Sequence, residues 1–217
     1  MRTHGPLNVA SWVEPLFGEN TFLVWPTGQT DAWIIDPGLP PQDQHVRDAL
    51  TRRRLTPAAI LLTHCHADHI AGVPLLQETY PACKLWAPRD EQHMLSDANA
   101  NLSAPFGFDV VAPLPHTALK GGDTLELGEL KWHVLDVSGH SPGGLAFYCP
   151  AAAVVFTGDT LIPGSIGRYD FPGSSGARLL ANIREKLLTL PDATVVYAGH
   201  GSASTIGHER QHNPFLE

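Results

Sequence analysis

The sequence predicts an α/β fold in which two mixed β-sheets pack face to face with helices outside, an αββα sandwich. Strand-like runs followed by helical segments occur twice along the chain, so each half can supply one sheet and its covering helices. No Ser/Pro-rich linker separates the halves. A chain of 217 residues with 43% apolar and 17% charged residues is long enough for one well-packed domain, and we expect a single domain over residues 1–217.

The first half begins with strands and continues into a helix. Apolar or β-branched runs predict strands over residues 7–13, 21–25 and 32–35. Residues 43–54 then have the pattern of an amphipathic helix, with Val46, Ala49 and Leu50 on its apolar face. A strand over residues 58–62 and short helices over 73–78 and 90–96 follow.

The second half repeats this order. Strands are predicted over residues 124–127, 130–137, 145–149 and 153–156. A helix over residues 177–189 and a last strand over 194–197 complete the sandwich.

Four short segments carry residues that bind metals: T-H-C-H-A-D-H at 63–69, S-G-H-S-P-G-G at 138–144, F-T-G-D-T at 156–160 and Y-A-G-H-G at 197–201. The candidate ligands are His64, His66, Asp68, His69, His140, Asp159 and His200. Imidazoles and carboxylates suit zinc, iron or manganese. Seven ligands are enough for two ions held about 3.5–4 Å apart, with one carboxylate bridging them and a shared hydroxide as nucleophile.

The positions of these segments indicate one shared site. Each of them directly follows a predicted strand, so we expect the ligands to gather at one edge of the fold. Glycines beside the ligands, such as Gly139, Gly158 and Gly199, let the backbone turn closely around an ion.

These motifs resemble the metallo-β-lactamase superfamily of hydrolases, and within it the hydroxyacylglutathione hydrolase (glyoxalase II) branch. The similarity runs from Asn20 to Leu216 and includes I-I-D-P-G at 34–38, N-L-S-A-P-F-G at 101–107, G-S-I-G-R-Y-D-F at 164–171 and the final N-P-F-L. It implies the metallo-β-lactamase fold. It also implies that one ion is held by His64, His66 and His140, the other by Asp68, His69 and His200, with Asp159 bridging both.

The predicted reaction is thioester hydrolysis by the metal-bridging hydroxide, with Asp68 and Asp159 as catalytic residues. Two divalent cations make hydroxide available near neutral pH and can hold an oxyanion. A thiolate leaves without a general acid because thiol pKa values lie near about 8.5, whereas an amine must be protonated. Asp68 has an alternative role as a carboxylate that orients a ligand imidazole.

Substrate recognition is predicted at Arg168 and Tyr169. The resemblance places a basic residue and aromatic neighbours there, in contact with glutathione, and Arg168 could pair with a carboxylate. Alternatively, Arg168 stabilises its own loop by pairing with Asp170 or another acidic residue. Longer members of the family carry a C-terminal helical region with further glutathione contacts; since this sequence lacks one, we expect a weak KM for S-D-lactoylglutathione.

Other functions remain open from the sequence. Persulfide dioxygenases resemble this chain in fold and motifs but use the equivalents of His64, His140 and Asp159 on one iron. Lactone or ester hydrolysis needs the same hydroxide, and a metal-stabilised binding module would need no turnover. Metal content and oxygen uptake separate the first alternative from a hydrolase.

Charge and composition limit the classes of partner that we expect this chain to bind. A net charge of −8, without a long Lys/Arg stripe, argues against nucleic acid and favours a small-molecule substrate. No stretch approaches the ~18 apolar residues of a membrane span or resembles a signal peptide, so we expect a cytoplasmic protein without a membrane partner. Three scattered cysteines fit a reducing compartment, and alternation in H-x-H points Cys65 away from the ligands into the packed interior.

Overall fold

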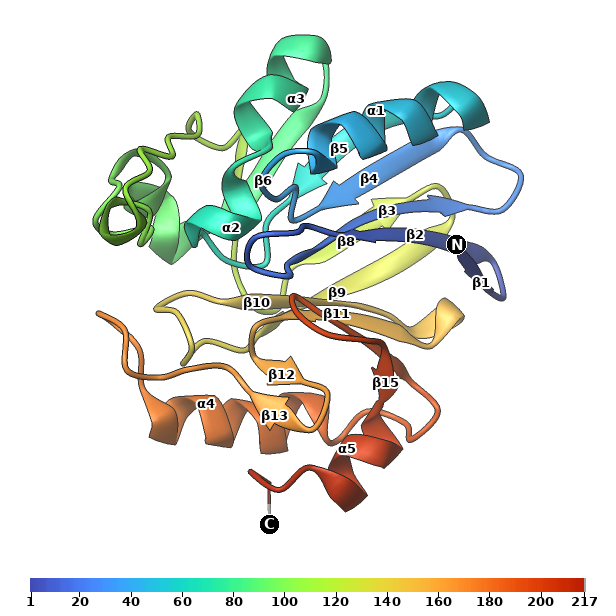
Figure 1. The fold of residues 1–217 in the computed structure, drawn as a ribbon. Coiled ribbons are helices and arrows are strands. Elements are labelled where there is room, and N and C mark those ends of the chain that lie inside the picture. The colour runs from blue at the N-terminus through green and yellow to red at the C-terminus, as the bar shows by residue number, and fades with distance from the viewer. Residues whose placement is uncertain (217) are drawn as a thin grey trace.

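Two mixed β-sheets form the centre of the computed structural model, which describes residues 1–216 (Figure 1). The first sheet has the order β1-β2-β3-β4-β5-β6-β7, antiparallel from β1 to β4 and parallel from β4 to β7. Its strands are β1 (Arg2–His4), β2 (Leu7–Val13), β3 (Asn20–Pro26), β4 (Asp31–Ile35), β5 (Thr56–Leu61), β6 (Lys84–Pro88) and β7 (Thr117–Leu119).

The second sheet has the order β15-β14-β11-β10-β9-β8, in which only the β11–β14 pair is parallel. Its strands are β8 (Thr124–Leu127), β9 (Leu130–Asp136), β10 (Leu145–Cys149), β11 (Val154–Gly158), β14 (Val195–Ala198) and β15 (Ser204–Thr205). A small hairpin of β12 (Leu161–Ile162) and β13 (Ser165–Ile166) follows β11.

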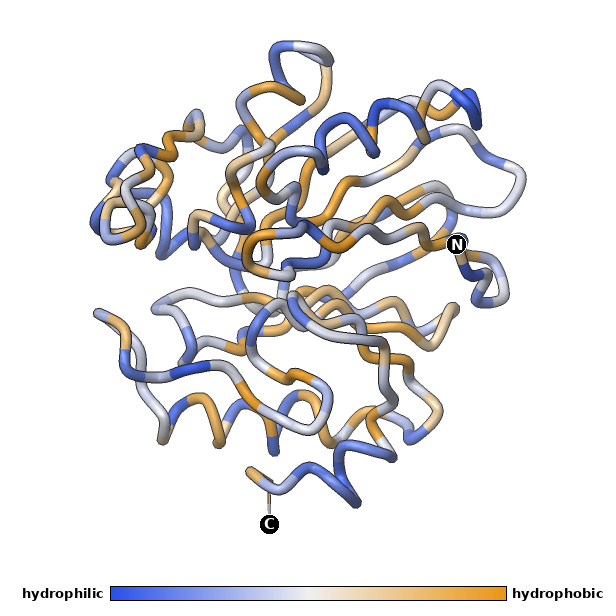
Figure 2. Tube along the Cα trace, viewed as in Figure 1, coloured by the Kyte–Doolittle hydropathy of each residue, from blue (hydrophilic) through white to orange (hydrophobic). Residues whose placement is uncertain are grey.

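Alternation along the strands divides the core into layers. In β4, Trp33 points between the sheets, where it meets Trp132 of the second sheet with ring centroids 5.4 Å apart, while Ile34 points to the outer helices. Successive strand residues point to opposite faces, so both faces of each sheet are buried. Figure 2 shows the hydrophobic segments following the strands, with hydrophilic ones in the outer helices and loops.

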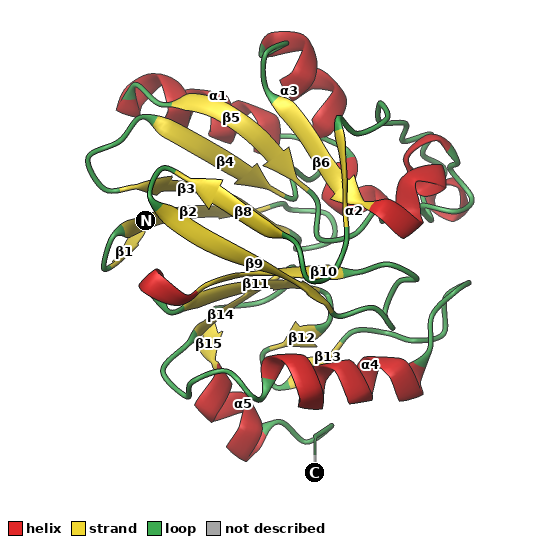
Figure 3. Cartoon of the chain, turned by 180° about the vertical axis from the view of Figure 1, so that it is seen from behind, coloured by secondary structure: helices red, strands yellow, loops and turns green. Residues whose placement is uncertain are grey.

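Helices cover the outer face of each sheet (Figure 3). The first sheet carries α1 (Gln42–Arg53), α2 (Ala67–Ile70) and α3 (Val73–Thr79), and the second carries α4 (Gly176–Asn182) and α5 (Ile206–His212). Short 3-10 turns lie at Arg89–Ser96, Ala104–Phe106 and Pro150–Ala152. The predicted αββα sandwich is confirmed.

The differences from the predicted elements are local. The helix expected over residues 177–189 is α-helical only to Asn182 and continues as a π-turn over Ile183–Leu187. The elements β1, α2, β6, β7, β12, β13, β15 and α5 had not been predicted, nor had the 3-10 turns at Ala104–Phe106 and Pro150–Ala152. Most of them are short, and β6 and β7 are defined by parallel pairing with distant strands, which local sequence patterns do not report. Among residues 1–216, no helix has both the length and the apolar character of a membrane span.

Candidate metal centre

All predicted metal ligands lie at the ends of strands, along the seam between the two sheets. In the first sheet, β5 leads into the loop that carries His64 and His66 and into α2, which carries Asp68 and His69. In the second sheet, β9, β11 and β14 lead to the remaining ligands: His140, Asp159 and His200. Buried strands therefore fix the backbone from which each ligand projects.

The ligands form two groups of three. His64, His66 and His140 make the first triplet, and Asp68, His69 and His200 make the second; within each triplet the ligand atoms lie within 4.8 Å of one another. These are the two sets that the family resemblance implied. The sequence prediction of which residues come together is thus matched by the geometry.

Asp159 lies between the two triplets. One of its carboxylate oxygens, Oδ2, is 3.6 Å from His140 Nε2 and 3.4 Å from His200 Nε2. The other, Oδ1, is 3.5 Å from His69 Nε2. A carboxylate that faces both triplets is placed as a bridging ligand must be.

Buried atoms without hydrogen-bond partners fit the presence of cations. Three of the buried unpartnered atoms belong to the candidate ligands: His64 Nε2, His69 Nε2 and Asp159 Oδ1. A buried polar atom without a partner is costly, and a metal ion satisfies lone pairs of this kind. The residues present therefore fit two divalent ions.

Outer hydrogen bonds fix the tautomers of the ligand imidazoles. His140 Nδ1 donates to the carbonyl of Arg168 at 2.7 Å, and His69 Nδ1 donates to Asp36 Oδ2 at 3.1 Å. His64 Nδ1 lies 3.1 Å from the Thr63 hydroxyl, which itself donates to Asp36 at 2.6 Å. Each Nε2 is left with a lone pair directed at the site.

Asp36 and Asp68 therefore have different roles. Asp36 is 1% exposed and is occupied by donors from Thr63 and His69, so it orients ligands from behind. Asp36 also falls in a group with His64 and His69 whose ligand atoms lie close together, but its oxygens already accept these hydrogen bonds. Asp68 Oδ2 lies 3.3 Å from His200 Nε2 inside the second triplet, which favours the ligand role over the alternative.

Two glycines permit the close approach of the ligand loops. Gly158 has a φ of 50°, and a Cβ on it would collide with Thr63. A Cβ on Gly199 would collide with Asp159 and His69. A larger residue at either position would force ligand-bearing segments apart.

Glu91 joins two ligand loops, a role that no sequence motif had indicated. Its side chain is fully buried and accepts from the backbone N–H of Cys65 and of Gly143, each at 2.7 Å. Cys65 lies between His64 and His66, and Gly143 belongs to the loop of His140. The Glu91 carboxylate thus fixes the loop of His64 and His66 relative to the loop of His140. The Cys65 side chain packs in the core on the helical side, as predicted.

Burial and neighbouring charges set the protonation of the metal-free site. Burial, reinforced by His140, lowers the pKa of His66 to about 3, and burial together with His69 and His66 holds the pKa of His64 well below its ordinary value. Burial alone would lower the pKa of His200, but hydrogen bonds to Asp159 and Asp68 outweigh it and raise that pKa to about 10. His64 and His66 are therefore neutral and can bind a cation directly, whereas the second triplet must release a proton from His200 when it binds one.

Zinc titration of the metal-free protein should saturate at two ions per chain and release protons. Affinity for the ion at the second triplet should increase with pH up to about 10, because His200 loses its competing proton as pH rises through its pKa. Metal analysis combined with calorimetry in two buffers of different ionisation enthalpy measures both quantities. Saturation at one ion would contradict the assignment, and the exposed His133→Ala should retain two ions.

The residues predicted to bind substrate occupy different places. Arg168 lines the cavity above the metal ligands, but its guanidinium makes a two-pronged ion pair with Asp170, at 3.0 and 2.8 Å. The ring of Tyr169 packs against Gly176 and is not part of the cavity lining. Phe171, which had not been singled out, lines the cavity and contacts His66 and His140, with ring centroids 5.4 and 5.9 Å apart.

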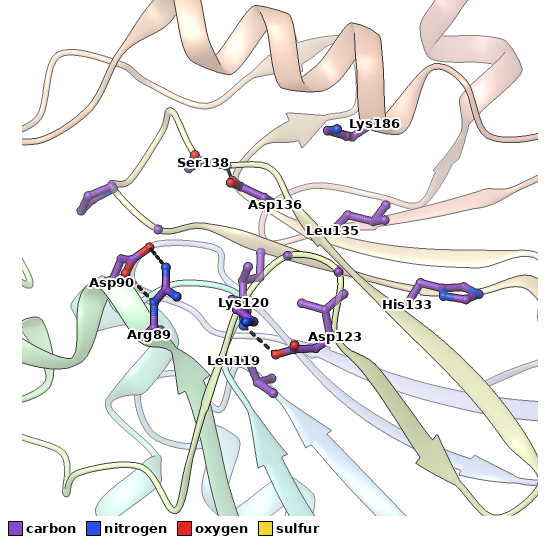
Figure 4. A pocket seen from close by; sticks show the side chains of 16 residues that line it. Arg89, Asp90, Leu119, Lys120, Asp123, His133, Leu135, Asp136, Ser138 and Lys186 are labelled. Carbon is purple, nitrogen blue, oxygen red and sulfur yellow. Dashed lines mark hydrogen bonds and ion pairs between the residues drawn. The ribbon is translucent and has the colours of Figure 1, made fainter.

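A larger cavity of about 600 Å³ lies elsewhere, and none of the seven ligands lines it (Figure 4). Its charged side chains make local contacts: Arg89 pairs with Asp90, and the Asp123 carboxylate accepts from the backbone of Lys120. The cavity above the metal ligands has a volume of about 310 Å³ and is the candidate active site.

Comparison with known proteins agrees with this geometry. The family model described as the metallo-beta-lactamase superfamily matches residues 15–200. The chain belongs to this superfamily. It is 34% identical over 202 residues to the hydroxyacylglutathione hydrolase GloC of Haemophilus influenzae, covering 92% of this chain and 93% of that protein.

Two solved structures are similar over nearly their whole length. The BLEG-1 B3 metallo-beta-lactamase superimposes with a TM-score of 0.91 at 35% identity, covering 96% of this chain and 99% of the other. TTHA1623, solved in a di-iron-bound form, has a TM-score of 0.85 at 36% identity, covering 95% and 100%. Membership in this superfamily, together with the clustered His and Asp side chains, supports binding of divalent metal by this protein.

Proposed function

We propose that this chain hydrolyses thioesters of the hydroxyacylglutathione type, with S-D-lactoylglutathione as the reference substrate. The observation that carries the proposal is the pair of ligand triplets with Asp159 between them, beneath one cavity that five of the seven ligands line. The similarity to GloC supports the substrate class, and the di-iron form of TTHA1623 supports two ions. Zinc is the proposed metal, with iron and manganese as the alternatives that metal analysis separates.

Two divalent ions, when bound, lower the pKa of a water and polarise a carbonyl oxygen. The chain supplies the rest. Asp68 and Asp159 line the cavity. Asp159 would hold both ions, and the carboxylate oxygen of Asp68 that holds no ion can accept the proton of the attacking water. The water oxygen forms the new C–O bond, the C–S bond breaks, and the sulfur leaves as a thiolate that takes up the proton. No general acid is needed because thiol pKa values lie near about 8.5.

The direct test measures thiol release from S-D-lactoylglutathione by protein loaded with zinc. Turnover that vanishes on chelation and returns with zinc supports the proposal. A chain that consumes oxygen with a glutathione persulfide, binds one iron and releases no thiol would instead be a dioxygenase. We also propose a small-molecule substrate and a cytoplasmic location; the three free, buried cysteines support a reducing compartment.

Arg168→Ala should raise the KM for S-D-lactoylglutathione more than it lowers kcat. A carboxylate clamp away from the reacting carbonyl contributes mostly uniform binding. The Arg168–Asp170 pair lies on the surface, with 67% and 64% of the two side chains exposed, and contributes little by itself, so a substrate carboxylate can replace Asp170. We expect a KM increase of about tenfold. Steady-state kinetics measure it.

Two further variants give the controls. Asp170→Ala frees the guanidinium and should lower KM, while the exposed Arg184→Ala should leave KM unchanged. An unchanged KM in Arg168→Ala would mean that Arg168 only anchors its own loop.

A further inference from the structure

The cavity above the metal ligands has two unlike walls. Five ligands form its floor: His66, Asp68, His140, Asp159 and His200. One wall carries Arg168, whose guanidinium stacks 4.4 Å from the centre of the Phe171 ring. This wall lies on the side of the first triplet, because Phe171 contacts His66 and His140.

The opposite wall is apolar and comes from two loops. Phe17 follows β2, Phe106 ends the 3-10 turn Ala104–Phe106, and Phe108 lies in the loop that leads from this turn to β7. Phe17 and Phe106 meet edge to face, with ring centroids 5.2 Å apart. A β-bridge between Glu19 and His200 places the Phe17 loop on the side of the second triplet.

Polar groups along this wall are already occupied. The Asn101 amide donates to the carbonyls of Met94 and Val110, and its oxygen accepts from the Ser103 hydroxyl. These hydrogen bonds stabilise the loop, and they leave few polar groups free to contact a substrate. Phe106 and Phe108 are nevertheless 61% and 40% exposed, so the wall presents aromatic surface to the cavity. Large exposed apolar surface beside a catalytic cavity marks a binding surface.

We infer that the acyl group of the substrate carries a bulky apolar substituent, aryl or branched alkyl, which packs on Phe17, Phe106 and Phe108. The inference rests on the proposed thioester hydrolysis. Arg168 on the other wall suits the carboxylates of the thiol half, which leaves the neutral wall for the acyl half. The reaction is unchanged: water attacks the carbonyl carbon, the C–S bond breaks, and an apolar 2-hydroxy acid and a thiol are released.

The test compares two substrates that differ only in this substituent. S-D-mandeloylglutathione has a phenyl group where S-D-lactoylglutathione has a methyl group, with the same hydroxyl and the same thiol. The metal-loaded protein should have a kcat/KM about tenfold higher for the mandeloyl thioester. Phe17→Ala and Phe106→Ala should each lower it by about tenfold for the mandeloyl thioester and less than about twofold for the lactoyl thioester.

A matched control removes an aromatic ring outside the cavity. Phe215 is 49% exposed and does not line the cavity, so Phe215→Ala should leave the ratio of the two kcat/KM values unchanged. Because the variant ratios are compared with the wild-type ratio, any intrinsic reactivity difference between the two thioesters cancels.

Binding of the acid products separates failure of this inference from failure of the proposed function. D-mandelate should bind the metal-loaded protein about tenfold more tightly than D-lactate, and Phe106→Ala should remove the difference. Tighter mandelate binding without any thioester turnover would support the apolar wall and reject thioester hydrolysis. Turnover of both thioesters with ratios unaffected by Phe17→Ala and Phe106→Ala, and equal affinity for both acids, would overturn the inference and leave the hydrolase intact.

Discussion

Asp159→Asn is expected to lose metal and activity together. The carboxylate lies 3.4 to 3.6 Å from ligand nitrogens of both triplets, so its charge is placed between two cations. Asparagine keeps the shape and removes that charge. Loss of a residue that merely orients a ligand costs about 10- to 100-fold in metal affinity or activity, and loss of a shared ligand should cost more. Metal analysis after dialysis and kcat/KM for S-D-lactoylglutathione measure both effects.

The matched control is Asp192→Asn. Asp192 is exposed and pairs with Arg210 on the surface, so this variant should keep two ions and wild-type turnover. Wild-type metal content in Asp159→Asn would refute the bridging role. Loss of activity with both ions retained would assign Asp159 to the reaction itself.

Asp36→Ala is expected to have the largest effect on stability. Asp36 is buried and accepts from the Thr63 backbone at 2.7 Å, from the Thr63 hydroxyl at 2.6 Å and from His69 at 3.1 Å. Alanine leaves all of these donors without an acceptor. It must also adopt a φ of 48°, which favours Asp, Asn or Gly. We expect a loss of about 3–5 kcal/mol in the free energy of unfolding, measured by urea denaturation of metal-free protein.

Asp36→Asn separates the effect of Asp36 on the orientation of the metal ligands from its effect on the stability of the fold. Asparagine accepts the left-handed backbone, but its amide cannot serve all the donors of a carboxylate. Metal affinity should fall by about 10- to 100-fold with a smaller loss of stability than in the alanine variant. The exposed Asp31→Ala should stay within about 0.5 kcal/mol of the wild type. A stable Asp36→Ala variant with normal zinc affinity would contradict this role.

The sequence predicted which candidate ligands come together, because the signal of each ligand is local. Each ligand follows a buried strand within a few residues, so the strand pattern and the motif together specify where it lies. The H-x-H-x-D-H string alone supplies two of the three members of each triplet. The same local pattern predicted the direction of Cys65.

The parts that were missed depend on contacts between distant segments. In the sequence, Glu91 is an ordinary acidic residue on a predicted short helix. In the structure it accepts hydrogen bonds from two ligand loops, because the fold brings these loops together. Phe17 and Phe106 are 89 positions apart in the sequence, and their rings meet only because the fold brings the two segments together on one wall of the cavity. For Arg168, the sequence allowed two roles, a contact with a substrate carboxylate and an ion pair with Asp170. Only the geometry shows that the ion pair with Asp170 is formed.

The supply of metal in the cell should influence how much folded protein exists, as well as how fast it works. Each triplet combines residues from both sheets, so a bound ion cross-links the two halves of the chain much as a disulfide would. An ion present at a hundred times its dissociation constant adds about 2.7 kcal/mol to the folded state, a large share of the stability of an ordinary domain. Metal starvation would therefore expose this chain to proteolysis, linking its abundance to the metal status of the cell.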